Sequence, residues 1–98
     1  MKRDEVLKIL AANRERLKEF SVKSLAIFGS VARDEATDAS DIDLLVEFEE
    51  GHPTGLFEFI ALMNRLEDLL GCKVDLVMVD ALRAEFREQV LKEAIRAA

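Results

Sequence analysis

The sequence predicts an α/β (α+β) fold in which helices pack on a small mixed β-sheet in two layers. Two observations lead to this prediction. Apolar residues recur at helical spacing in three segments, and short apolar or β-branched runs separate these segments. The chain has 98 residues, of which 50% are hydrophobic and 35% charged. We therefore expect one globular domain over residues 1–98.

In the first half of the chain, apolar residues with charges between them predict an amphipathic helix over residues 4–20. The run KSLAIFGS predicts a strand over 24–29, which Gly29 ends. The segment VARDEATDAS mixes a helical turn with polar loop residues. After it, DIDLLVEF predicts a second strand over 41–48, because it alternates at its start and is then mostly apolar.

In the second half, EEGHPTG is expected to be a loop, with His52 as a turn residue rather than a general base. Apolar residues three and four apart predict a helix over 55–70, and Gly71 is a natural stop for it. The run CKVDLVMV predicts a third strand. Asp80 is placed to cap a last helix, whose weak apolar stripe and AIRAA end we expect to pack partly on a partner.

Charge and composition exclude several functional classes. With 14 basic and 20 acidic residues the net charge is -6, the wrong sign for binding nucleic acid or an anionic membrane. No apolar run approaches the roughly 20 residues that span a bilayer, and MKRDEVLK lacks the apolar stretch of a signal peptide. We expect a soluble, cytoplasmic protein. One cysteine and one histidine exclude an internal disulfide and a Cys/His zinc site, so Cys72 is expected to be a partly buried apolar residue.

The stretch SDIDLLV places two carboxylates at the head of a strand. Side chains alternate along a strand, so Asp41 and Asp43 lie on one face and the apolar residues between them face the core. Their repulsion, on the order of one to a few kcal/mol, would be removed by a divalent metal. Mg²⁺ suits hard oxygen ligands and usually shares its shell with phosphates, so the pair points to a nucleotide.

Asp75 interrupts the third strand in the same way. If the second and third strands are neighbours, three carboxylates meet, as a two-metal phosphoryl or nucleotidyl transfer site needs. At the end of the first strand, Gly29 and Ser30 would cradle phosphates through backbone N–H groups and a hydroxyl. Arg33 would add a charge-assisted contact.

Each of these features also has a purely structural interpretation. A DxD at the head of a strand occurs as a solvated turn or a cap, and Arg33 can pair with an acidic neighbour. Lys73, Asp75 and Glu47 can form cross-strand salt bridges on a solvent-facing sheet. The functional interpretation rests on the combination of the features.

That combination, Gly29-Ser30, ten residues, Asp41-Ile42-Asp43 and an aspartate in a later strand, resembles the signature of the DNA polymerase beta-like nucleotidyltransferase superfamily. The stretch FGSVARDEATDASDIDLLVEF is similar to the corresponding stretch of the minimal, MNT-type members of this superfamily. Those members act as antitoxins beside HEPN-domain toxins. The resemblance covers nearly the whole chain. It implies a nucleotidyltransferase-like mixed sheet flanked by helices. It also implies Mg²⁺-dependent transfer of AMP from ATP to a hydroxyl, which in the HEPN systems is a tyrosine of the toxin.

Carried over by position, the resemblance implies two sets of site residues: phosphate-binding Gly29, Ser30 and Arg33, and metal-ligating catalytic Asp41, Asp43 and Asp75. It implies two Mg²⁺ ions as cofactors, with Asp75 also helping to remove the acceptor proton. Asp34 stands where the family often has glycine, which bears on the geometry of that loop.

The resemblance implies a HEPN toxin as partner in a hetero-oligomer. Larger relatives carry a helical domain for which 98 residues leave no room, so we expect an open nucleotide pocket that a partner closes. Two alternatives stay open. One is a non-catalytic antitoxin that neutralises its partner by complex formation, and the other is the catalytic subunit of a small-molecule nucleotidyltransferase.

Overall fold

A computed structural model of the chain describes residues 2–35, 37, 41–50 and 55–97, and in this part the strands form one four-stranded sheet in the order β3-β2-β1-β4. The strands are β1 (Val22–Phe28), β2 (Ile42–Phe48), β3 (Val74–Met78) and β4 (Ile95–Arg96). β1 runs antiparallel to both β2 and β4, whereas β2 and β3 are parallel. The predicted mixed sheet is therefore confirmed.

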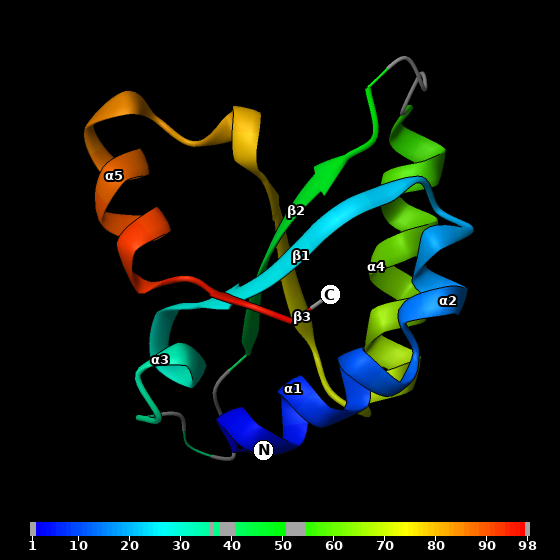
Figure 1. The fold of residues 1–98 in the computed structure, drawn as a ribbon, viewed down its shortest axis with the longest axis horizontal. Coiled ribbons are helices and arrows are strands. Elements are labelled where there is room, and N and C mark those ends of the chain that lie inside the picture. The colour runs from blue at the N-terminus through cyan, green and yellow to red at the C-terminus, as the bar shows by residue number, and fades with distance from the viewer. Residues whose placement is uncertain (1, 36, 38–40, 51–54, 98) are drawn as a thin grey trace.

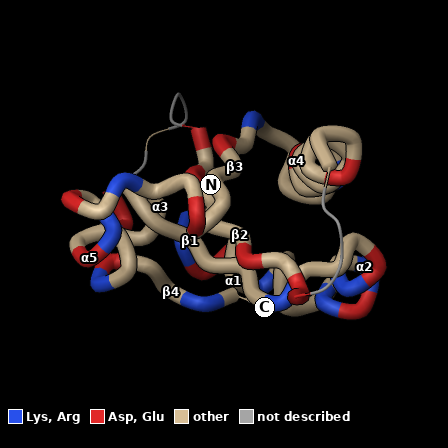
Figure 2. The backbone as a smooth tube through the Cα atoms, turned by 90° about the horizontal axis from the view of Figure 1, so that it is seen from above, with Lys and Arg blue, Asp and Glu red and all other residues tan. Residues whose placement is uncertain are grey.

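The helices lie on both sides of this sheet, rather than in the single layer that the sequence predicted, because α5 covers the other face (Figure 1). On one side are α1 (Arg3–Ala12), α2 (Arg14–Lys18) and α4 (Leu56–Leu70). On the other side is α5 (Ala84–Glu93), which follows a 3₁₀ turn at Val79–Ala81. The short α3 (Gly29–Ala32) follows β1 directly, and its buried Val31 and Ala32 belong to the same core as the first group of helices. The view from above also shows α5 on one side of the strands and α2 and α4 on the other (Figure 2).

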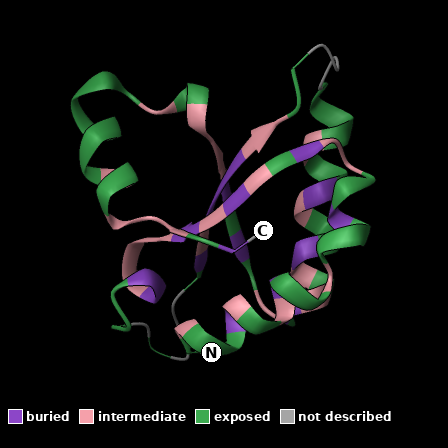
Figure 3. Ribbon diagram, in the orientation of Figure 1, coloured by how far each residue is buried: buried purple, intermediate pink, exposed green. Residues whose placement is uncertain are grey.

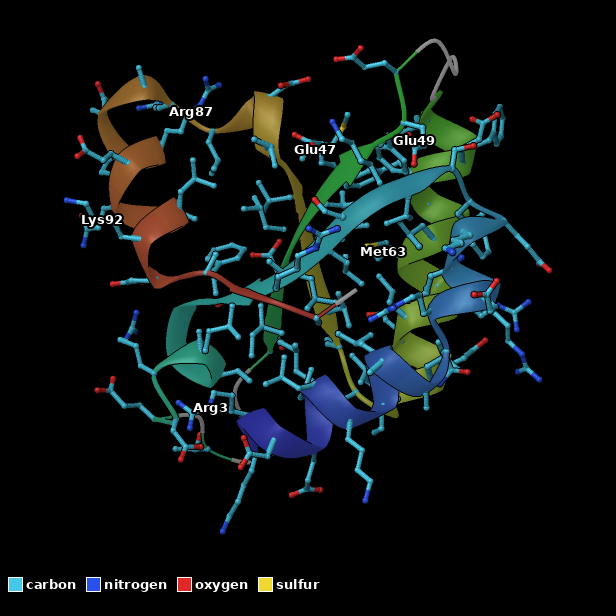
Figure 4. The ribbon with its side chains drawn as sticks, in the orientation of Figure 1. Arg3, Glu47, Glu49, Met63, Arg87 and Lys92 are labelled. Carbon is cyan, nitrogen blue, oxygen red and sulfur yellow. The ribbon has the colours of Figure 1, made fainter. Side chains whose placement is uncertain are left out.

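The main core lies between the sheet and the first group of helices. Ile42, Leu44 and Val46 of β2 belong to this core, as the alternation predicted. Leu45, between them, is also buried (3% exposed) but is not part of this core, because it lies on the other face of the strand. The other fully buried large side chains come from β1 and from every described helix except α5 (Figure 3): Val6, Leu10, Leu17, Leu25, Ile27, Val31, Leu62 and Leu66. Met63 lies on the sheet-facing side of α4 and packs against this core (Figure 4).

The prediction of one helix over 4–20 is wrong, because the chain leaves the helical path at Asn13 (φ -110°, ψ 16°). The side-chain amide of Asn13 donates a hydrogen bond of 2.8 Å to the carbonyl oxygen of Ile9. Such local bonds compete with the backbone ladder, and asparagine makes them readily. The segment is therefore two helices joined at an angle.

The last segment also differs from the prediction. Asp80 does not cap a helix but lies in the 3₁₀ turn, and α5 begins only after Arg83. Beyond α5, Ala94 is extended (φ -66°, ψ 137°), so the chain pairs with β1 as β4 instead of continuing as a helical surface. The N–H of Ala97 donates to the carbonyl oxygen of Leu25 at 2.8 Å, which anchors this end to the sheet.

The middle of the chain follows the prediction closely. Gly71 ends α4 in the left-handed conformation (φ +70°), and its N–H donates to Glu67 O at 2.8 Å. Cys72 is half-buried against the core, as expected. His52 falls within residues 51–54, outside the described residues. In the part of the chain that the structure describes, no helix has the length and apolar character needed to cross a bilayer.

We expect α4 and α5 to differ sharply in their contribution to stability. Leu66→Ala removes a side chain that is 0% exposed in the core and should cost about 2–5 kcal/mol of unfolding free energy. Leu91→Ala, on α5, removes a side chain that is 47% exposed and should cost less than about 1 kcal/mol. Urea unfolding of both variants measures this, and equal losses would contradict the assignment of the core.

Candidate active site

Two of the predicted site carboxylates are brought together by the parallel pairing of β2 and β3. Asp43 is opposite Asp75 in register, on strands about 4.8 Å apart, which confirms that these strands are neighbours. Both side chains lie on the face away from the core, because Leu44 and Leu76 beside them are buried. The start of β3 is held by α4, whose Glu67 carboxylate accepts a 3.1 Å hydrogen bond from the N–H of Val74.

The glycine of the Gly-Ser pair lies directly against one of these carboxylates. Phe28, the last residue of β1, pairs with Asp43, and the chain then turns at Gly29 with φ +70°. A Cβ on Gly29 would overlap Oδ2 of Asp43 and lie 3.2 Å from its Cγ. Only glycine therefore allows both this turn and this position of the Asp43 side chain.

The electrostatics of Asp43 favour a cation. Burial is the largest influence that raises the pKa of its carboxyl, and the negative charges of Asp75 and Asp41 raise it further. The positive charge of Arg33 acts in the opposite direction. Asp41 is exposed and lies just before β2 begins. Its charge nevertheless acts on Asp43, as that of Asp75 does, although Asp41 lies outside the strand.

The donor chemistry of this group fits Mg²⁺. In the described ranges, no three or more His, Cys, Asp or Glu side chains are already gathered closely enough to hold an ion. The half-buried Asp43 and the exposed carboxylates beside it nevertheless supply hard oxygen atoms on one face. A divalent cation would remove the repulsion that raises the pKa of Asp43.

Arg33 and Ser30 both belong to the turn that follows β1. Ser30 is half-buried in α3, and its carbonyl oxygen accepts a 2.8 Å bond from the N–H of Glu35. Arg33 follows α3 and is exposed; its Nε lies 3.2 Å from Glu35 Oε2 and its Nη1 lies 3.2 Å from Glu93 Oε2. The hydrogen bond to Glu35 is the largest influence that raises the pKa of this guanidinium. The ion pairs match the structural interpretation of Arg33, and its contact with phosphate stays a prediction.

Two contacts near the site were missed by the sequence analysis. Glu93 of α5 is 60 residues from its partner Arg33, and nothing local in the sequence indicates such a pair. Glu47, labelled on β2 in Figure 4, pairs with Lys23 of β1 (Nζ–Oε1 3.5 Å) rather than with the predicted Lys73 and Asp75. An acidic and a basic residue on antiparallel neighbours would have suggested this pair once the register was known.

The family of the chain follows from comparison of its sequence with known families. Residues 6–97 match the nucleotidyltransferase domain. This chain belongs to the nucleotidyltransferase domain family. It is similar to the protein adenylyltransferase MntA of Thermococcus cleftensis, with 43% identity over 93 residues that cover 94% of this chain and 92% of the relative. A Methanocaldococcus jannaschii relative, also named as a protein adenylyltransferase, is 46% identical over 90 residues, 91% of this chain and 90% of its own.

Solved structures agree with this membership. A structure described as a minimal nucleotidyltransferase has a TM-score of 0.83 and 41% identity, and covers 97% of this chain and 95% of its own. A toxin-antitoxin structure with AMP-PNP has a TM-score of 0.68, 20% identity and coverage of 100% and 73%. A complex of tri-AMPylated Shewanella oneidensis HEPN toxin with MNT antitoxin has a TM-score of 0.65, 18% identity and coverage of 94% and 71%. The last two show the shared fold alone. The match to the family and the similarity to MntA show that the chain is an NTP-dependent nucleotidyltransferase.

Replacing Gly29 tests whether its contact with Asp43 matters for more than the turn. Gly29→Ala and Gly71→Ala both place a side chain at φ +70°, and each should lose about 1–2 kcal/mol of unfolding free energy. Only Gly29→Ala should also lose nucleotidyl transfer, because the added Cβ displaces Asp43, whereas at Gly71 nothing lies within 4 Å. Urea unfolding and a transfer assay of both variants measure this. Normal transfer by Gly29→Ala would contradict the role of the contact.

The raised pKa of Asp43 also predicts a pH dependence of stability. The folded chain holds this proton more tightly than the unfolded chain, so ionisation of Asp43 destabilises the fold once the pH is above the raised pKa. Asp43→Asn should therefore be more stable than the unaltered chain at about pH 7, and the difference should shrink towards about pH 4. Thermal unfolding of both proteins without divalent ions across this range measures the difference. A difference that grows on acidification would be the wrong sign.

Proposed function

We propose that this nucleotidyltransferase transfers AMP from ATP to a tyrosine hydroxyl of a cognate HEPN toxin in the cytoplasm, with Mg²⁺, and so acts as an antitoxin. One observation carries the proposal: the Gly29 turn, Asp43 and Asp75 converge at one end of the sheet. The relatives named as protein adenylyltransferases support the reaction type. The complex of an AMPylated HEPN toxin with an MNT antitoxin supports the partner.

In this proposal the turn after β1 holds the leaving end of ATP. The bare Cα of Gly29 allows the backbone to approach phosphate oxygens closely, and the hydroxyl of Ser30 donates to them. Arg33 would exchange its exposed partners, Glu35 and Glu93, for phosphate, which offers a guanidinium the same paired oxygens as a carboxylate. The pyrophosphate would then leave from this turn.

The carboxylates would act where the acceptor hydroxyl, the second reactant, meets the α-phosphate of ATP. The new bond forms between the acceptor oxygen and the α-phosphorus, and the bond from that phosphorus to the bridging oxygen of pyrophosphate breaks. Asp75, on the face that carries Asp43, accepts the proton of the attacking hydroxyl. Mg²⁺ held by Asp41, Asp43 and Asp75 would neutralise phosphate charge and favour the ionised acceptor.

The decisive test replaces one carboxylate and weighs the product. The protein encoded beside this chain, which the proposal takes to be the HEPN toxin, is incubated with ATP, Mg²⁺ and the chain, and its intact mass is measured. The unaltered chain should add one or more AMP groups, and Asp43→Asn should slow the transfer at least about a hundredfold, because several kcal/mol of charge stabilisation are lost. Asp68→Asn, an exposed aspartate of α4, is the matched control and should transfer normally.

The same experiment separates the alternatives. A tight complex in which Asp43→Asn still silences the HEPN protein, without any gain of mass, would favour a masking module. AMP found on a small hydroxylated compound instead of the protein would favour a small-molecule nucleotidyltransferase. Equal transfer by Asp43→Asn and the unaltered chain would overturn the assignment of the site.

A further inference from the structure

An apolar groove lies where β3 ends, on the free edge of the sheet. Its volume is 400 Å³, and its walls come from the first turns of α4 and from β3 with the turn after it: Leu56, Phe59, Leu76, Val77, Met78 and Ala81. β3 is the outermost strand of the order β3-β2-β1-β4, so no strand in the described part of the chain pairs with its outer side. Unpaired backbone groups at an edge are ready to bind another chain.

The rim of the groove carries an exposed large apolar side chain. Leu56, in the first turn of α4, lines the groove and is 71% exposed; this upper end of the helix is green in Figure 3. Single exposed apolar residues are ordinary, but here an exposed leucine is continuous with an apolar groove that Phe59 also lines. Aromatic residues that line a pocket are typical anchors of protein interfaces.

The groove is also close to the proposed acceptor side of the site. The groove opens beside α4, on the core side of β3, whereas the side chain of Asp75 lies on the other face of this edge strand, two residues before Val77. Two residues of a strand span about 7 Å, so a molecule that is seated in the groove and crosses the free edge of β3 reaches Asp75.

The charges around the groove restrict what can occupy it. The two segments that form it, residues 55–60 and 75–82, contain Glu58, Asp75 and Asp80 and no lysine or arginine. Glu58 already accepts a 3.0 Å hydrogen bond from the N–H of Gly55, whereas Asp80 is exposed beyond the end of β3. A second copy of the chain would set acidic residues against acidic residues, so a partner with basic residues is favoured.

We propose that this groove is the docking surface for the acceptor protein, and this rests on the proposed function. The occupant is a segment of the acceptor that presents an apolar or aromatic side chain flanked by arginine or lysine. The apolar side chain fills the groove between α4 and β3, and the basic residues meet Asp80. The surface thereby holds the acceptor hydroxyl next to Asp75.

The test separates docking from chemistry by measuring KM and kcat for the acceptor. Leu56→Ser and Asp80→Lys should each raise the KM for the proposed HEPN acceptor at least about tenfold. The kcat at saturating acceptor and the affinity for ATP should stay near those of the unaltered chain, because neither residue contacts the reacting atoms. Phe86→Ser on α5 is the matched control, since Phe86 is also exposed (53%) but lies outside the groove. Its KM should not change.

Each other outcome has a definite meaning. Transfer by the unaltered chain with an unchanged KM in Leu56→Ser and Asp80→Lys overturns the docking surface and leaves the proposed function standing. An equal rise of KM in Phe86→Ser also overturns the assignment to this groove. No transfer by the unaltered chain overturns the proposed function and, with it, the docking surface. Circular dichroism of the variants confirms that exposed substitutions have left the fold intact.

Discussion

The close approach of Gly29 to the carboxylate of Asp43 is the constraint on which the arrangement of the site depends. It fixes the turn between β1 and α3, because only a residue without Cβ can have φ +70° there and leave room for Oδ2. It also fixes the position of β2 against β1, since Phe28 and Asp43 are partners in the ladder. A Gly-Ser pair and a DxD that are well separated in the sequence are thus one structural unit.

The apolar alternation on the opposite face holds the carboxylates where they repel each other. Leu44 beside Asp43 and Leu76 beside Asp75 are 0% and 7% exposed, so a one-residue slip of either strand would expose a core side chain. The core therefore enforces a position that burial and charge make unfavourable for an ionised Asp43. A site held in this way has a preformed attraction for a cation, since binding relieves a repulsion that folding imposes.

The sequence predicted what depends on local periodicity and failed where distant contacts decide. Period-two alternation was sufficient to place Asp43 and Asp75 on one face, and the left-handed glycine was sufficient to end α4 at Leu70. The break at Asn13 depends on one side-chain hydrogen bond, which apolar spacing does not reveal. β4 forms because a short C-terminal run pairs with the side of β1 that does not pair with β2. Glu93, one partner of Arg33, is 60 residues away from it in the sequence. Neither contact has a local signal.

α5 is attached to the rest of the fold by weaker interactions than the strands of the core, and this difference determines where a rigid site can lie. α5 has no buried residue, and the exposed pair of Arg33 with Glu93 contributes only about 0–1 kcal/mol, so β4 and the Ala97 bond to Leu25 are the firmer attachments of this end. β1, β2 and β3 are instead fixed by a continuous core on their other face. Carboxylates that must keep their geometry lie on these strands. Arg33, whose partners must be exchangeable to meet phosphate, is exposed at the end of α3 and pairs with Glu93 of the loosely held α5.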